Sequence, residues 1–166
     1  MRVLKIFGIG ICCGLILSAF FGCSSTLPSQ SLQPGQVEDM LRNHHFEFKA
    51  HSMTGLRGRK EILSPGYGFK IMGDTVHSEL PYKGESTQAP MNPEDAGYFF
   101  TSLSFRYDLN PRSEKSWMLK LEISDQRFAR AFHLLVFENG KAELDIYSNF
   151  RDPIHFQGSM EAIEQP

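Results

Sequence analysis

The chain has 166 residues, of which 41% are hydrophobic and 22% are charged, and its formal net charge is -2. This length predicts one domain, and the hydrophobic fraction is sufficient for a packed core. The near-neutral charge balance argues against nucleic-acid binding, because nucleic-acid-binding domains are usually strongly basic. Three cysteines are too few for a dense disulfide framework.

The first 22 residues predict a bacterial secretory signal. Arg2 and Lys5 are followed by an apolar run from Ile6 to Phe21, and no acidic residue occurs before Gly22. A basic start, a short apolar stretch and a small-residue exit are typical of such signals. The run is shorter than the ~20 apolar residues of a membrane-spanning helix, and glycines interrupt it.

The end of this segment, Ala19-Phe20-Phe21-Gly22-Cys23, resembles a lipobox, in which a small residue precedes the cysteine that becomes diacylated. We therefore predict a lipoprotein signal peptide over residues 1–22 and lipid attachment at Cys23. The alternatives are an uncleaved N-terminal anchor and a plain signal peptide in which Cys23 has no role. Cleavage would leave a mature charge of about -4 and no free thiol, so we expect no disulfide, catalytic cysteine or cysteine-based metal site.

The mature chain is predicted to begin with a flexible tether over residues 23–36, which is rich in Ser, Gln and Pro. A single domain follows over residues 37–166. Apolar residues recur at spacings of three and four from Val37 to His44, which predicts a short amphipathic helix.

Period-2 alternation of apolar and polar residues predicts strands in most of the remaining domain. The alternating segments are 45–51, 67–72, 99–109, 117–124, 141–146 and 154–159. The stretch from Phe128 to Phe137 is apolar on both sides and predicts a central strand covered on both faces. Asn139-Gly140 after it is a hairpin signal. The chain is thus expected to be mainly β, an antiparallel meander of about seven strands forming a barrel or sandwich, with one short N-terminal helix.

Several short motifs occur in a characteristic order within residues 37–163. They are Leu80-Pro81-Tyr82-Lys83-Gly84, Phe105-Arg106-Tyr107, the Asn139-Gly140 hairpin and a last strand that reaches Gly158. In this the chain resembles the DUF4251 family, small secreted or lipid-anchored proteins of Bacteroidota-type bacteria without an assigned function. The resemblance implies a compact β-rich periplasmic lipoprotein domain, and it implies no chemistry.

The segment 76–97 is expected to be a long loop, and long loops inside compact domains are often functional. In a functional interpretation Pro81, Tyr82 and Gly84 belong to a lid or partner-contact loop, with Tyr82 stacking on a ligand. In the structural interpretation Leu80 and Tyr82 plug one end of the barrel, and Gly84 supplies a turn with positive φ.

Two further patterns are weak as sites. The basic cluster Arg57-Gly58-Arg59-Lys60 is expected in a solvated turn, although it could contact lipid headgroups or the acidic groups of a partner. We expect neither a metal nor a cofactor, because the histidines lack metal-ligand spacing. They are His44, His45, His51, His77, His133 and His155.

The function expected from these patterns is that of a non-enzymatic binding or accessory module, anchored to the membrane by lipid on Cys23. It would hold a small apolar ligand or dock to an envelope protein, since 14 Phe and 5 Tyr exceed the needs of a small core. Ser24 and Ser25 favour the outer membrane, facing the periplasm. The alternative is an envelope hydrolase that uses Asp152 and His155, which lie three residues apart.

Overall fold

The computed structural model describes Leu32 and residues 35–163. The predicted signal peptide, Cys23 and all of the predicted tether except Leu32, Gly35 and Gln36 lie outside the described residues. The described chain contains one α-helix, α1 (Gln36–Arg42), and one short 3-10 helix, η1 (Pro93–Ala96). Ten strands follow the order β1 (His45–Gly55), β2 (Lys60–Ile62), β3 (Gly68–Met72), β4 (Thr75–Pro81), β5 (Gly97–Ser102), β6 (Phe105–Ser113), β7 (Ser116–Ile123), β8 (Ala131–Phe137), β9 (Lys141–Tyr147) and β10 (Ile154–Glu161).

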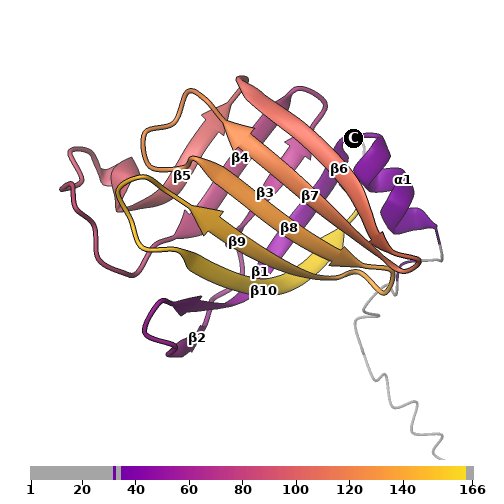
Figure 1. Ribbon diagram of the computed structural model, residues 1–166, viewed down its shortest axis with the longest axis horizontal. Helices are drawn as coiled ribbons and strands as arrows, with labels where there is room; N and C mark the ends of the chain where they lie inside the picture. The colour runs from indigo at the N-terminus through magenta and orange to yellow at the C-terminus, as the bar shows by residue number, and fades with distance from the viewer. Residues whose placement is uncertain (1–31, 33–34, 164–166) are drawn as a thin grey trace, which may run out of the picture.

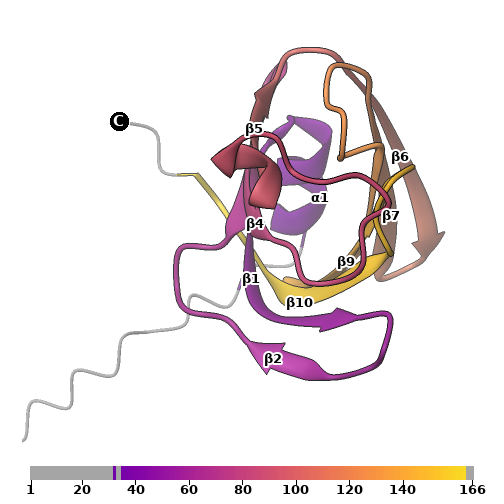
Figure 2. The same cartoon turned by 90° about the vertical axis from the view of Figure 1, so that its left-hand side faces the viewer.

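The strands form one antiparallel sheet in the order β5-β4-β3-β1-β10-β9-β8-β7-β6, and β2 pairs with β1 beside this path. The sheet curls around α1 into a half-barrel (Figures 1 and 2). Strands β5 and β6 follow each other in the chain but form the two opposite edges of the sheet. The expectation of a mainly β, antiparallel domain with one N-terminal helix is therefore confirmed.

Helix α1 lies within the curve of the sheet. It begins after Gly35, which has a φ of 85°, and it buries Val37 and Leu41 against the strands. The predicted helix is confirmed but ends at Arg42, because His44 has a φ of 50° and starts the turn into β1. No helix among the described residues has the length and apolar character needed to cross a bilayer.

The interior of the half-barrel is filled by aromatic rings. Phe132 of β8 lies at their centre, with its ring centroid 5.7 Å from that of Phe69, 6.2 Å from Tyr98 and 6.0 Å from Phe100. These edge-to-face contacts join the β8 wall to the opposite wall made by β3 and β5. Five phenylalanines on the inner face are at most 1% exposed: Phe46, Phe48, Phe69, Phe132 and Phe156.

The meander from β6 to β10 follows the predicted pattern closely. Gly140 has a φ of 78° in the turn between β8 and β9, which confirms the hairpin. Gly158 of β10 lies so close to β1 that a Cβ there would collide with the carbonyl oxygen of Lys49. Strand β8 is central, as predicted, but its outer face is only half-buried at Leu135 and Phe137, so the expected cover on both faces is wrong.

The strand predicted over 99–109 is in fact two strands. The alternation continues through Leu103, but this residue is 73% exposed and lies in the short link between β5 and β6. Ser102 Oγ accepts a hydrogen bond from the Ser104 amide at 3.2 Å and donates to Asp125 at 2.6 Å. A local pattern cannot reveal that the chain passes here from one sheet edge to the other.

The loop expected over 76–97 is only partly a loop. Its first part forms β4, whose Val76, Ser78 and Leu80 are buried between β3 and β5. The serine in this inward-facing row weakens the alternating signal. The three-residue β2 also carries no pattern of its own, so the sheet has ten strands instead of about seven. The remaining loop, 82–92, leads into η1, which has a capping box formed by Asn92 and Asp95.

Candidate functional site

The predicted loop residues Pro81, Tyr82 and Gly84 lie together at one end of the half-barrel. Pro81 is the last residue of β4 and pairs with Gly97. The Tyr82 hydroxyl donates to the carbonyl oxygen of Glu85 at 2.6 Å, and its ring packs edge-to-face on Tyr98 at 5.7 Å. Partial burial raises the pKa of Tyr82. The ring and the hydroxyl of Tyr82 therefore both contact residues of this chain.

Gly84 is not among the residues with positive φ, so the predicted reason for a glycine at this position is wrong. The structure gives a different reason. A Cβ at residue 84 would lie 2.5 Å from the hydroxyl oxygen of Tyr82. Glycine is therefore needed because the Tyr82 ring folds back over the backbone here.

A buried arginine contacts several segments of the chain at this end of the molecule. Arg151 is 6% exposed, and its Nη1 donates to the carbonyl oxygen of Gly97 at 2.7 Å while Nη2 donates to that of Asp95. Its guanidinium carbon lies 4.1 Å from the ring centroid of Phe128 and 4.6 Å from that of Tyr82. The cation is stabilised by ring faces and backbone carbonyls, and no carboxylate of the described residues pairs with it.

The 82–88 segment is also bonded to the link between β9 and β10. The Thr87 amide donates to the carbonyl oxygen of Phe150 at 2.8 Å, and the Asp152 amide donates to that of Glu85 at 3.1 Å. In return the Glu85 amide donates to a carboxylate oxygen of Asp152 at 3.3 Å. These hydrogen bonds join the loop to a segment that lies more than 60 residues away in the sequence.

The hydrolase hypothesis needs Asp152 and His155 to act on each other. In the described part of the chain they share no hydrogen bond. Nδ1 of His155 lies 2.8 Å from a carboxylate oxygen of Asp145 on β9, whereas Asp152 accepts from the Glu85 amide. The two residues are held by different partners, so the structure does not bring this predicted pair together.

A surface pocket of about 380 Å³, which we call the end pocket, lies between the β1–β2 turn and the 83–85 segment. Its rim carries two ion pairs, one between Arg57 and Glu85 and one between Lys83 and Glu61. The side chain of Arg59 has no partner among the described residues. The lining residues are Met53, Gly55, Leu56, Arg57, Arg59, Glu61, Lys83, Gly84, Glu85 and Asp152. The predicted basic turn and the predicted loop therefore meet at one pocket.

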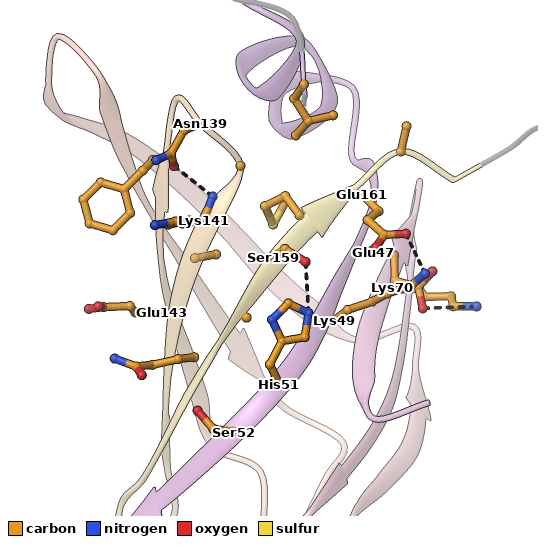
Figure 3. Close-up of a pocket in the computed structure, with 18 of the residues that line it drawn as sticks. Glu47, Lys49, His51, Ser52, Lys70, Asn139, Lys141, Glu143, Ser159 and Glu161 are labelled. Atoms are coloured by element: carbon orange, nitrogen blue, oxygen red, sulfur yellow. Dashed lines mark hydrogen bonds and ion pairs between the residues drawn. The ribbon is translucent and has the colours of Figure 1, made fainter. Parts of the chain in front are cut away.

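A wider groove of about 1520 Å³ runs over the outer face of β1, β10 and β9 (Figure 3). Small residues such as Ser52 and Ser159 line it, and charged side chains stand around them. Most of these charges are paired: Lys49 lies 2.5 Å from Glu161 and Lys70 lies 3.6 Å from Glu47. His51 lies 3.3 Å from the hydroxyl oxygen of Ser159. Apolar side chains line the groove together with these charged ones, and among the described residues it holds no group of three or more His, Cys, Asp or Glu that could hold a metal ion.

The comparisons with known proteins give a family but no activity. The model of the family described as "Domain of unknown function (DUF4251)" matches residues 29–160. The chain belongs to the DUF4251 family. A search of curated proteins found no match.

The fold of this DUF4251 chain is also seen in a crystal structure of a DUF4251 family protein from Bacteroides eggerthii DSM 20697. The two share 14% sequence identity with a TM-score of 0.52, and the likeness covers 75% of this chain and 84% of that one. At this identity the comparison shows the fold alone. The match of the family model to residues 29–160 confirms the family resemblance inferred from the sequence motifs.

Five of the six histidines of this DUF4251 chain are dispersed over the sheet, and His44 lies in the turn between α1 and β1. Three side chains lie opposite one another on the outer face, because the register pairs His133 with Asp145 and Asp145 with His155. Burial lowers the pKa of His133, and the charge of Lys120 lowers it further. Within residues 35–163, no group of three or more His, Cys, Asp or Glu side chains is arranged to hold a metal ion.

Sequence reasoning missed Arg151. Its neighbours Phe150 and Asp152 give no local sign that an arginine here is buried, because the rings around it come from Tyr82, Tyr98 and Phe128. The only local signal in the sequence is the turn-rich stretch before β10, which contains the aromatic residue Phe150. A cation held by three distant rings can be found only when the sheet order is known.

Proposed function

We propose that this DUF4251 chain is a lipid-anchored binding module of the cell envelope that docks to an envelope protein through the end pocket. In this proposal lipid on Cys23 holds it at the outer membrane, facing the periplasm, and it has no enzymatic activity of its own. The observation that carries the proposal is the end pocket, where the basic turn after β1 meets the Lys83–Glu85 segment.

The filled interior favours docking at the surface over storage of an apolar ligand inside the sheet. Phe69, Phe132 and Phe156 occupy the space where such a ligand would lie, and all three are almost fully buried. The end pocket opens on the surface, and its volume of about 380 Å³ lies at the lower end of the range for ligand sites, roughly 300–1,000 Å³.

The composition of the end pocket suits a protein partner. Leu56, which is 67% exposed, and Met53 both line the pocket and give it apolar surface. Arg57 and Lys83, each in an ion pair with a glutamate, line the pocket as well. Protein–protein interfaces commonly have an apolar centre surrounded by a polar rim. Exposed pairs of this kind contribute little to stability and can exchange partners on docking.

The position of the pocket suits a tethered domain. The described chain begins at the α1 end, and β1 runs from there to the end pocket over 11 residues, roughly 35 Å of extended strand. Figure 1 shows α1 and β2 at opposite ends of the molecule. A domain anchored ahead of α1 would present the end pocket away from its anchor.

The anchoring is tested by labelling cells with palmitate and fractionating them. We expect the full chain to carry label in the membrane fraction, Cys23→Ala to lose it, and Cys13→Ala, within the predicted signal, to keep it. Retention of both label and membrane location by Cys23→Ala would overturn the anchoring.

The docking is tested by affinity purification of the full chain from detergent-solubilised envelopes. We expect Leu56→Asp to lose a co-purifying protein that the unchanged chain retains. Met72→Asp is the matched control, because Met72 is also exposed but lies at the α1 end, where it pairs with His45. Equal recovery of the same protein with Leu56→Asp and with the unchanged chain would overturn docking at the end pocket.

A further inference from the structure

Strand β6 leaves one row of backbone groups open. The Ser124 amide donates to the carbonyl oxygen of Ser104 at 2.9 Å, and the register continues from there with Phe105 opposite Ile123. In an antiparallel pair, residues bonded to one neighbour alternate with residues whose N–H and C=O point the other way. The even-numbered residues of β6 therefore bond to β7, and the odd-numbered ones point to the free edge.

Three residues present both backbone groups at this edge: Phe105, Tyr107 and Leu109. In the described part of the chain none of these amides or carbonyls has a hydrogen-bond partner. Pro111, the next in the row, has no N–H, which is tolerated where the N–H would face solvent. Strand β5 does not close the gap, because α1 lies in the opening (Figure 2) and the Tyr107 hydroxyl is bonded to the carbonyl oxygen of Leu41 at 2.7 Å.

The two faces of β6 differ in character. Phe105, Tyr107 and Leu109 are half-buried and pack against the core. The outer face carries Arg106 and Asp108, both exposed. Arg106 forms an ion pair with Glu122, and Asp108 accepts from the Asn110 side chain at 3.0 Å. No charged side chain points inward to oppose the addition of a strand, a common protection of edge strands.

We propose that two copies of this chain associate by antiparallel pairing of their β6 edges, centred on Tyr107. In this register Tyr107 faces Tyr107 of the second copy, and Phe105 faces Leu109. Each of these pairs exchanges two backbone hydrogen bonds. Arg106 then lies opposite Asp108 of the second copy, and the two-fold axis repeats this pair of opposite charges.

The other registers are worse. The nearest ones are centred on Arg106 or on Asp108, and each of these sets that residue directly against the same charge of the second copy. Centring the pair on Leu109 places Pro111, which cannot donate, opposite Tyr107, and sets Arg106 against Arg112 of the second copy. Centring it on Phe105 leaves half of the pairing outside the strand, since β6 begins at this residue. The sequence of β6 is thus complementary to itself in one register. This inference does not rest on the proposed function, because the end pocket is built from other elements.

The test co-expresses full-length copies with two different tags and measures how much of one co-purifies with the other. We expect Arg106→Glu to weaken the association about tenfold, because two opposed pairs become like-charged. The double variant Arg106→Asp with Asp108→Arg restores the opposite charges across the interface and is expected to recover it. Arg112→Glu, the same charge change outside the pairing, is the matched control and should leave it unchanged.

A cysteine cross-link tests the register itself. A mixture of Arg106→Cys and Asp108→Cys copies should form a disulfide-linked dimer far better than either variant alone, and Glu122→Cys on β7 should not. Far-ultraviolet circular dichroism verifies that each variant is folded. A monomeric full-length chain, association unchanged in Arg106→Glu, or a different protein paired with β6 would overturn the proposal.

Discussion

The two edges of the sheet are protected in different ways. Strand β5 is short, and the carbonyl oxygen of Gly97 at its start accepts a hydrogen bond from Arg151, a residue 54 positions away in the sequence. Strand β6 has nine residues and no such cover, only the charges of Arg106 and Asp108 and the proline at residue 111. A distant side chain therefore covers the first residue of one edge strand, whereas the other edge depends on its own sequence. The open row of backbone groups on β6 is available for pairing.

The largest effect is expected from the ring that supports β5 from inside. Phe132→Ala removes contacts to Phe69, Tyr98 and Phe100 and leaves a cavity, so we expect the free energy of unfolding to fall by about 4 kcal/mol. Denaturant unfolding followed by the fluorescence of Trp117, the single tryptophan, measures it.

Phe137→Ala, on the half-buried outer face of the same strand, is the control and should cost less than half as much. Equal losses in the two variants would show that the inner rings do not join the two walls.

A smaller loss is expected when the cap on β5 is removed. Arg151→Met keeps an extended side chain among the rings but leaves the carbonyl oxygens of Gly97 and Asp95 without their donor. We expect a loss of about 2 kcal/mol, since hydrogen bonds from charged donors contribute about 1.5–3 kcal/mol each and removal of a buried charge offsets part of this. Limited proteolysis should then cut within residues 82–96.

Arg127→Met is the matched control. Arg127 also lies over the Phe128 ring, at 5.3 Å, but it is exposed and bonds to the Met91 and Gln88 side chains instead of to backbone carbonyls. Arg127→Met should lower the free energy of unfolding by less than about 1 kcal/mol. If Arg151→Met lowers the free energy of unfolding no more than Arg127→Met does, the contrast between the two edges is wrong.

The contrast between the edges also shows what a sequence can and cannot predict. Alternation over 117–124 and 141–146 and the turn at Asn139-Gly140 are local signals, and they predicted the meander correctly. The edge position of β5 and the buried cation at Arg151 depend on contacts between segments more than 50 residues apart. The same is true of the end pocket. The sequence singled out the Arg57 turn and the Lys83 segment separately, but only the pairing of β1 with β2 and the course of the 82–88 loop bring them together.

The smallest effect concerns the buried phenols, one on each edge strand. The Tyr107 hydroxyl on β6 donates to Leu41, whereas the Tyr98 hydroxyl on β5 has no hydrogen-bond partner among the described residues. We therefore expect Tyr107→Phe to lose about 1 kcal/mol at pH 8 and Tyr98→Phe to lose little. The same unfolding measurement by Trp117 fluorescence compares them.

At high pH the Tyr107→Phe variant should no longer be less stable than the unchanged chain. This pH dependence is the control for the prediction. Burial raises the pKa of both Tyr98 and Tyr107. Unfolded tyrosine ionises near pH 10, so the unfolded state binds fewer protons above that pH, and the stability that is complete below it is lost as the pH rises. Near pH 11 each buried phenol should cost the unchanged chain about 1.4 kcal/mol, a loss that phenylalanine avoids. Tyr107→Phe should then be at least as stable as the unchanged chain, and a deficit of the same size at both pH values would contradict the burial of this ring beside α1.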